Sequence, residues 1–165
     1  MPAELSCPII RLEQLERVEG LVNRAAADGG RIVAGGKRGD RGGKGFWFEP
    51  TVIADVDENS EIAQTEVFGP VLSIIRYEGN DDEAVQVANN SKYGLSAYVQ
   101  SRDEDRAWKV ANRLKAGTVN INNSFYLSPD SPFGGYGISG VGVEHGTDGF
   151  REYLQVKTIA SPAKS

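Results

Sequence analysis

The sequence predicts an α/β fold with a mainly parallel sheet flanked by helices. Short apolar runs rich in β-branched residues occur at Val71–Ile75, Leu95–Val99 and Thr118–Asn122, and the segments between them carry helix signals. Such alternation is typical of βαβ units, in which the strands run parallel and helices cover the sheet. The length of 165 residues suits one domain with a buried core.

The first predicted element is an amphipathic helix. Its apolar side chains recur three and four positions apart, with charged residues between them. The apolar set is Leu12, Leu15, Val18, Leu21, Val22 and Ala25. Gly29-Gly30 should end the helix, because glycine readily adopts the left-handed cap conformation, and Arg31–Ala34 should form a strand.

A glycine-rich basic run, Gly35–Gly45, follows this strand and has the composition of a phosphate cradle. A phosphate loop depends on the N-terminus of a helix directly after it. Here Phe46-Trp47-Phe48 instead opens an extended segment that runs to Val56. The context therefore favours a mobile surface hairpin loop over an anion site.

The stretch Thr65–Val71, TEVFGPV, should connect a helical turn over Ser60–Glu66 to a buried strand. Gly69-Pro70 cannot continue a helix, because proline lacks an amide donor and disfavours helical geometry in the residue before it. Glu66 and Phe68 then lie on a tight connector at the edge of a core. Taken alone, this pattern favours a solvated carboxylate and a core aromatic over a polar binding site.

Two later helices are predicted from capping boxes. Asn80 and Ser101 are each followed three positions later by a glutamate, Glu83 and Glu104, and then by an apolar helical pattern. The strand that ends at Asn122 follows the second helix. Because parallel sheets bind ligands beyond the carboxyl ends of their strands, Asn122, Asn123 and Phe125 are expected at a ligand crevice.

The segment Gly135–Gly140 reads GYGISG and matches the G-x-G-x-x-G dinucleotide pattern. Its context contradicts that function, since a Pro-Phe-Gly-Gly turn precedes it and Val141-Gly142-Val143 follows it in place of a helix. We interpret it as an ordered, irregular loop whose glycines allow close backbone approach.

Composition narrows the classes of partner. The formal net charge is −5 and the basic residues are scattered, so nucleic acid and anionic membranes are not expected partners. No apolar run approaches the roughly 20 residues that span a bilayer, and no signal peptide is recognised, so a cytoplasmic location is expected. One cysteine, Cys7, and one histidine, His145, predict neither an internal disulfide nor a metal site.

Five motifs together resemble the C-terminal portion of the NAD(P)-dependent aldehyde dehydrogenase superfamily. In chain order they are FEPTVIADV (Phe48–Val56), EVFGPV (Glu66–Val71), NNSKYGLSAYV (Asn89–Val99), AGTVNIN (Ala116–Asn122) and SPFGGYGISGVG (Ser131–Gly142). The resemblance extends from about Ile10 to Ile159. It implies a catalytic-domain-like α/β fold over residues 1–152 and an oligomerisation-type strand and tail over residues 153–165.

The family oxidises aldehydes to carboxylic acids with NAD or NADP. By resemblance, Glu66 hydrogen-bonds the nicotinamide ribose and Phe68 packs near the nicotinamide, which reverses the interpretation from local pattern alone. Asn122 and Phe133 line the active site by the same resemblance. No metal is implied.

The family's Rossmann domain, general base and nucleophilic cysteine precede the matched segment. No catalytic residue is therefore expected among these residues, and Cys7 does not stand at the nucleophile's place. Two functions remain open: the C-terminal part of a split or truncated dehydrogenase, inactive and without appreciable cofactor binding by itself, or a non-enzymatic module that docks on a full-length dehydrogenase.

The tail carries the expected assembly element. Leu154, Val156 and Thr158 alternate with Gln155, Lys157 and Ile159 over a strand-length run. In the resembling family this strand pairs with another subunit. We therefore expect a homo-oligomer or a complex with a complementing dehydrogenase chain, formed through Tyr153–Ile159.

Overall fold

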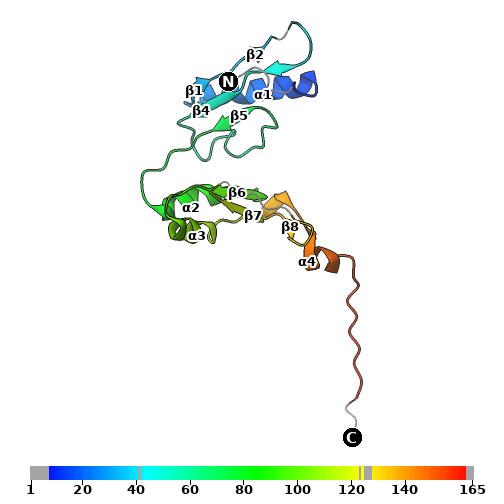
Figure 1. The fold of residues 1–165 in the computed structure, drawn as a ribbon. Helices are drawn as coiled ribbons and strands as arrows, with labels where there is room; N and C mark the ends of the chain where they lie inside the picture. The colour runs from blue at the N-terminus through cyan, green and yellow to red at the C-terminus, as the bar shows by residue number, and fades with distance from the viewer. Residues whose placement is uncertain (1–7, 41, 123, 125–127, 163–165) are drawn as a thin grey trace. The chain divides into compact units, whose positions relative to one another are not determined.

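A computed structural model describes residues 8–162 except 41, 123 and 125–127. The chain divides after Asn90 into two compact units, one up to Asn90 and one from Ser91 onward. Both units combine helices and strands (Figure 1), which confirms the α/β class.

The first unit is built around strand β4. Its elements are α1 (Leu12–Ala27), β1 (Arg31–Ala34), β2 (Arg38–Gly39), β3 (Trp47–Phe48), β4 (Thr51–Ala54), β5 (Val71–Ser73) and α2 (Asp81–Asn89). Strand β4 pairs with β1 in antiparallel orientation and with β5 in parallel orientation. Strands β2 and β3 form an antiparallel hairpin, as expected for the glycine-rich run.

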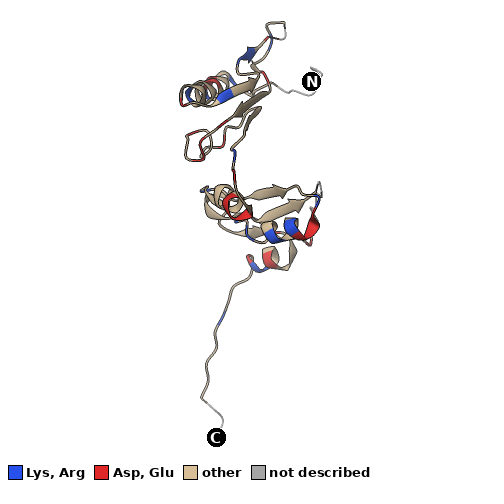
Figure 2. Cartoon of the chain, turned by 90° about the vertical axis from the view of Figure 1, so that its left-hand side faces the viewer, with Lys and Arg blue, Asp and Glu red and all other residues tan. Residues whose placement is uncertain are grey.

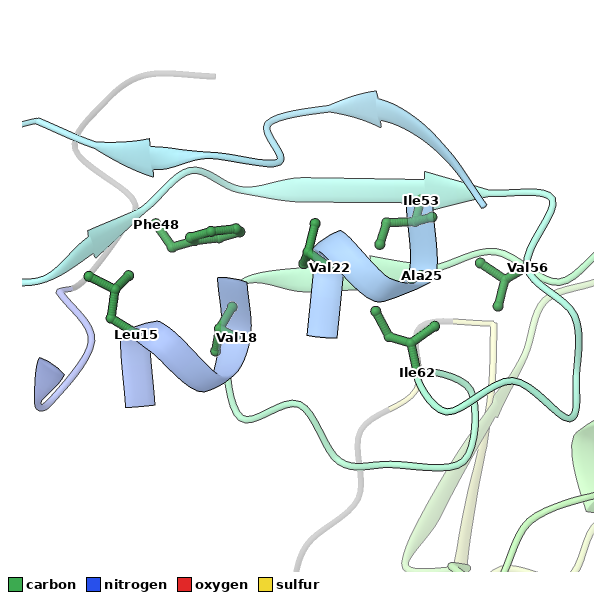
Figure 3. Packing of buried hydrophobic residues seen from close by; sticks show 8 residues of the cluster. All are labelled: Leu15, Val18, Val22, Ala25, Phe48, Ile53, Val56 and Ile62. Atoms are coloured by element: carbon green, nitrogen blue, oxygen red, sulfur yellow. The ribbon is translucent and has the colours of Figure 1, made fainter. Parts of the chain in front are cut away.

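Helix α1 packs its apolar stripe on this sheet. Leu15, Val18, Val22 and Ala25 lie against Phe48 and Ile53 (Figure 3), and the side chains of Val18, Val22 and Ile53 are fully buried. Val56 and Ile62 close the cluster at one end. The helical periodicity of the sequence thus correctly identified the α1 side of the core, except for Leu12 in the first turn, which is 41% exposed.

The C-terminus of α1 ends in the glycine cap predicted from the sequence. Gly29 has φ of 102° and donates its amide to the Ala26 carbonyl at 3.3 Å, while the Gly30 amide donates to the Ala25 carbonyl at 2.8 Å. This pair of bonds is a Schellman motif, which satisfies carbonyls that the helix end leaves unpaired. It also turns the chain directly into β1.

The second unit contains one βαβ crossover followed by short, irregular elements. The crossover consists of β6 (Ser96–Val99), α3 (Glu104–Ala111) and β7 (Thr118–Ile121), with β6 and β7 parallel. After it come β8 (Phe133–Gly134), the 3₁₀ turn η2 (Gly137–Ser139), β9 (Val143–Glu144) and α4 (Gly146–Arg151). Strands β8 and β9 form an antiparallel pair.

The expectation of one mainly parallel sheet was wrong for the described residues. Their strands form one three-stranded and three two-stranded sheets, and parallel pairing is confined to β4–β5 and β6–β7. Parallel strands need a long crossover, usually a helix. The chain between β1 and β4 contains only the β2–β3 hairpin, so β1 returns to β4 antiparallel.

Strand β5 is not buried on both faces, contrary to the interpretation of its apolar sequence. Val71 and Ile75 pack against the core, but Leu72 is 59% exposed and Ile74 is 44% exposed. The reason is that β5 lies at the edge of its sheet and α1 covers only one face. An apolar, β-branched run cannot by itself tell a covered face from an open one.

The helix starts were predicted correctly for α2 and two residues early for α3. Asn80 Oδ1 accepts the amides of Asp82 at 2.9 Å and Glu83 at 3.2 Å and caps α2. Helix α3 is capped by Asp103, whose Oδ1 accepts the Arg106 amide at 2.9 Å. Ser101 contributes one step earlier, because its Oγ accepts the Asp103 amide at 3.1 Å.

Residues Gln155–Pro162 form no helix or strand in the single chain, and residues 151–162 are all exposed. The expected oligomerisation-type strand is therefore not formed here. An isolated edge segment has no neighbour with which to form ladder hydrogen bonds, so the single chain does not test its pairing.

Acidic and basic residues are distributed over the helices and loops of both units (Figure 2). Opposite charges meet in exposed pairs, such as Arg24 with Glu61 at 2.7 Å and Arg31 with Asp55 at 2.9 Å. Among the described residues, none of the helices has the length and apolar character needed to cross a membrane.

Candidate functional site

The loop over Glu66–Pro70 joins a turn to strand β5. The expected helical turn before it is only a single hydrogen-bonded turn, in which the Ser60 carbonyl accepts the amides of Ala63 and Gln64, both at 3.1 Å. No regular secondary structure follows until Val71. The loop therefore depends on contacts from elsewhere for its conformation.

Two side chains of α1 bind the loop backbone. Gln14 Nε2 donates to the carbonyls of Val67 and Phe68, each at 3.0 Å. Arg17 Nη1 donates to the Val67 carbonyl at 2.7 Å, and Arg17 Nη2 donates to the Glu66 carbonyl at 2.8 Å. Three consecutive carbonyls are thus fixed by one face of one helix.

Three residues of the loop, Val67, Gly69 and Pro70, anchor it to the core and to β4. A Cβ on Gly69 would lie 2.7 Å from Cγ2 of the fully buried Val18, so only glycine fits against α1 here. The Pro70 carbonyl accepts the Thr51 amide at 2.8 Å, which aligns the chain with β4 before β5 begins. Val67 packs against the core cluster. The glycine and proline that predicted the connector therefore have separate structural roles.

These contacts with α1 and β4 leave Glu66 and Phe68 directed to solvent. The Phe68 side chain is 74% exposed and its backbone has φ of 51°, in the left-handed region. Glu66 is exposed, and its carboxylate has no hydrogen bond or ion pair with the described residues. The local interpretation of Phe68 as a core aromatic is wrong, because Val67 takes the core position and Phe68 points away from it.

The carboxyl end of β7 holds Asn122 in a structural role. Asn122 is left-handed, with φ of 50°, and its amide donates to the Val99 carbonyl at 2.9 Å. Its Oδ1 accepts the Ser101 amide at 2.9 Å, so it links the ends of β6 and β7. Asn123 and Phe125, the other residues expected there, lie outside the described residues, as does Cys7.

Phe133 lies on β8, half-buried, with its ring centroid 6.5 Å from that of His145. It borders an open pocket of about 380 Å³ in the second unit. The other lining residues are Leu95, Gly134, Gly135, Ser139, Gly140, Gly142, Val143, Glu144, Glu152 and Tyr153. The pocket combines apolar side chains with two carboxylates.

The GYGISG segment forms no dinucleotide fingerprint, as its context predicted. It runs from β8 through η2 to β9, without the following helix that aims amides at a pyrophosphate. Its glycines serve close packing instead. A Cβ on Gly135 would lie 2.8 Å from the Ser139 Cβ, and one on Gly137 would overlap the Lys92 carbonyl oxygen.

The four predicted site residues belong to two units: Glu66 and Phe68 to the first, Asn122 and Phe133 to the second. Sequence reasoning missed Gln14 and Arg17. Their signal was weak but present, since residues three apart share one helix face and both are polar beside the apolar stripe. The described residues hold no group of three or more His, Cys, Asp or Glu side chains suited to a metal ion.

Comparison with known proteins decides the family. Residues 2–159 match the aldehyde dehydrogenase family. The chain belongs to the aldehyde dehydrogenase family. A putative aldehyde dehydrogenase of Staphylococcus aureus strain USA300 is 45% identical over 155 residues, which cover 93% of this chain and 32% of that protein. The chain thus spans about a third of the length of this curated relative.

Solved aldehyde dehydrogenases show the same fold. An aldehyde dehydrogenase of Mycobacterium tuberculosis complexed with NAD⁺ is 41% identical with a TM-score of 0.88, covering 98% of this chain and 33% of the other. Betaine aldehyde dehydrogenase of Staphylococcus aureus in complex with NAD⁺ is 45% identical with a TM-score of 0.83, covering 90% and 30%. Aldehyde dehydrogenase C of Pseudomonas syringae, as a mutant with NAD⁺ and octanal, is 43% identical with a TM-score of 0.85, covering 96% and 33%.

Proposed function

We propose that this chain is the C-terminal part of an aldehyde dehydrogenase and completes an aldehyde-oxidising site that uses NAD or NADP. The observation that carries the proposal is the loop over Glu66–Pro70. There the Glu66 carboxylate, which has no partner among the described residues, and the exposed Phe68 ring lie two positions apart on a backbone anchored to α1. An exposed aromatic ring and a carboxylate without partners have little value for the stability of the unit itself. They suit a ligand that has both a polar sugar and a flat ring.

The residues present fit one end of a nicotinamide cofactor. The Glu66 carboxylate would accept hydrogen bonds from vicinal ribose hydroxyls, and Phe68 would offer a flat apolar surface to the nicotinamide ring. When bound, the nicotinamide supplies the hydride acceptor. The described residues provide no helix N-terminus behind a glycine loop for the pyrophosphate, so this grip is partial.

Within the second unit, the proposal assigns Asn122 and Phe133 to lining the aldehyde. Among the described residues, the Ser101 amide bonds only the side-chain oxygen of Asn122, which leaves the NH₂ group of Asn122 for a ligand. Phe133 presents an aromatic side chain at the open pocket. These residues orient and enclose a substrate; neither is a nucleophile or a base.

The open face of β5 supports completion by further polypeptide. Leu72 on this edge strand and Ile74, the residue directly after it, expose apolar side chains, and β5 carries no charge to protect the edge. The solved relatives are about three times as long as the portion that matches this chain, since it covers 30–33% of each. In this proposal, polypeptide equivalent to that additional chain covers this face.

The isolated chain is expected not to oxidise aldehydes. A free cysteine has a pKa near 8.5, so only a few per cent is thiolate at neutral pH without an activating base. Orientation of the two reactants accounts for roughly 7–11 kcal/mol of the barrier reduction, which a partial cofactor grip cannot supply. Cys7 has no activating base of the family among these residues, so it is not expected to replace the nucleophile.

The test measures NADH formation with excess NAD⁺ and a simple aldehyde. The chain is assayed alone, as Cys7→Ser, and with the separately expressed N-terminal two thirds of a related dehydrogenase. Activity only in the mixture, lowered by Glu66→Gln in this chain, supports the proposal. Turnover by the isolated chain that disappears in Cys7→Ser would overturn it.

A second candidate is a non-enzymatic module that docks on a full-length dehydrogenase. The exposed tail, in which Val156 is 96% exposed and Ile159 83%, favours this candidate. Co-purification with an intact homologue, without activity in the complemented mixture, would select it over the enzymatic proposal.

A further inference from the structure

We infer that Gln14 and Arg17 of α1 are positioning residues. They hold the loop over Glu66–Pro70 in the conformation that presents Glu66 and Phe68 to the cofactor. The role in cofactor binding rests on the proposed function. The part of the inference that concerns loop conformation, namely that two helix side chains fix the loop, rests on the hydrogen bonds alone. Neither side chain needs to touch the cofactor for this role.

The contacts converge on a short stretch of backbone. The carbonyls of Glu66, Val67 and Phe68 accept four hydrogen bonds from Gln14 and Arg17, at 2.7–3.0 Å. The two from Arg17 are charge-assisted and use both terminal nitrogens of its planar guanidinium, which restricts direction as well as distance. Lysine, a point charge, cannot reproduce that geometry.

The two side chains are themselves held in place. Gln14 and Arg17 lie three residues apart on one face of α1, and the neighbouring residues Leu15 and Val18 are buried in the core. The helix backbone at these positions therefore cannot shift without disturbing the core. A loop that is hydrogen-bonded to such a helix is held in a fixed position relative to the helix.

The loop needs such a constraint because its conformation is costly. Phe68 has φ of 51°, a region that bulky L-residues avoid, and its ring is exposed and gains little from packing. If the carbonyls on either side were released, Phe68 would relax to negative φ and its ring would turn away. Preorganisation of this kind lowers the ordering cost of binding.

The expected consequence is specific to binding. A released loop must be ordered again when the cofactor arrives, so the KM for NAD⁺ rises while kcat changes little. A role confined to fold stability would instead lower the amount of folded protein and leave both constants of the folded fraction unchanged.

The first arm of the test uses the full chain without cofactor. Backbone ¹⁵N relaxation is measured for wild type, for Gln14→Ala/Arg17→Ala, and for Arg24→Ala, which removes a different exposed pair from the same helix. In the double variant the order parameter of the Phe68 amide should fall from about 0.85 to below about 0.6. Amides of β4 should not change, and Arg24→Ala should match wild type.

The second arm uses the chain complemented with the N-terminal two thirds of a relative. The double variant should raise the KM for NAD⁺ about tenfold, which corresponds to ~1.4 kcal/mol of lost binding. A Gln14→Ala/Arg17→Lys variant, with lysine in place of alanine at position 17, should recover only part of the lost NAD⁺ binding, because lysine cannot bond two carbonyls through a planar fork.

The relaxation and KM measurements distinguish the positioning role of Gln14 and Arg17 from the proposed function of the chain. An unchanged Phe68 order parameter in the folded double variant, or a loss of kcat at constant KM, overturns the positioning role. A wild-type mixture without activity would count against the proposed function only. The relaxation measurement would then still decide whether Gln14 and Arg17 hold the loop.

Discussion

At Phe68 a bulky aromatic residue occupies the left-handed region of backbone space, with its ring mostly in solvent. This conformation costs of order 1–3 kcal/mol, and no burial of the ring offsets it. The hydrogen bonds from Gln14 and Arg17 and the glycine contact with Val18 offset part of it instead. Strain at an exposed aromatic residue is typical of a functional loop rather than of a core.

Replacing Phe68 tests this strain. Phe68→Gly should be more stable than Phe68→Ala by about 1 kcal/mol, reversing the usual advantage of alanine, because only glycine adopts positive φ without cost. Urea unfolding followed by circular dichroism measures the difference. Equal stability of the two variants, or a more stable alanine variant, would show that the position is not strained.

Glu19 and Arg38 form a two-point ion pair between α1 and the β2–β3 hairpin. Arg38 Nε donates to Glu19 Oε1 at 3.0 Å and Arg38 Nη2 donates to Oε2 at 2.6 Å. The hydrogen bond from Arg38 lowers the pKa of the Glu19 carboxyl from its ordinary value. The charged form of Glu19 is therefore favoured in the folded state.

The pH dependence follows from that direction. A carboxyl whose pKa is lower when folded contributes stability above its unfolded pKa and loses it as the pH falls through the folded value. Glu19→Gln should therefore lower the urea midpoint modestly at pH 7, and the difference from wild type should shrink below pH 4.5. A difference that is constant from pH 7 to pH 3 would contradict this assignment.

At the scale of the element, the start of α3 shows how closely spaced polar residues share a helix end. Ser101, Asp103 and Glu104 all match positions of capping patterns, and the structure gives the cap to Asp103. Ser101 instead bonds the Asp103 amide, while Asn122 bonds the Ser101 amide. In the turn between β6 and α3, side-chain oxygens of Asn122, Ser101 and Asp103 thus each accept a hydrogen bond from a backbone amide.

The cap assignment predicts unequal effects of two substitutions. Asp103→Ala should destabilise the second unit by about 1 kcal/mol, because it removes the acceptor for the Arg106 amide. Ser101→Ala should cost less, since it leaves the helix capped. Amide hydrogen exchange at the start of α3 provides the readout, and the reverse order of effects would return the cap to Ser101.

At the scale of the whole molecule, we propose that the C-terminal tail carries assembly. Residues Gln155–Pro162 have no secondary structure within the chain, and the exposed large apolar residues among them include Val156 and Ile159. Exposed apolar side chains and unpaired backbone groups in one segment favour pairing with another chain. The proposed partner is a second copy or a complementing dehydrogenase chain.

Truncation after Glu152 tests that role. The intact chain should form dimers or larger particles by light scattering, and the truncated chain should be monomeric under the same conditions. A sequence-scrambled tail of the same length serves as the control, because it keeps the composition and removes the alternation. If the truncated chain has the same mass per particle as the intact chain, another surface carries assembly.

By itself, the sequence determined the local elements and the family. The three-and-four spacing from Leu15 to Ala25 placed α1 and its buried face, Gly29-Gly30 predicted its cap, and Glu66 and Phe68 were singled out by motif resemblance. These features depend on contacts within a few residues or on a long ordered set of motifs. Both are readable without coordinates.

Only the tertiary structure decided which surfaces are covered and what holds the loop. Residue types alone do not reveal that Leu72 and Ile74 lie on an open face, that Asp103 outcompetes Ser101, or that Gln14 and Arg17 bond carbonyls some 50 positions away. A long-range hydrogen bond to a backbone carbonyl leaves no signature in the acceptor's residue type, because every residue carries the same carbonyl.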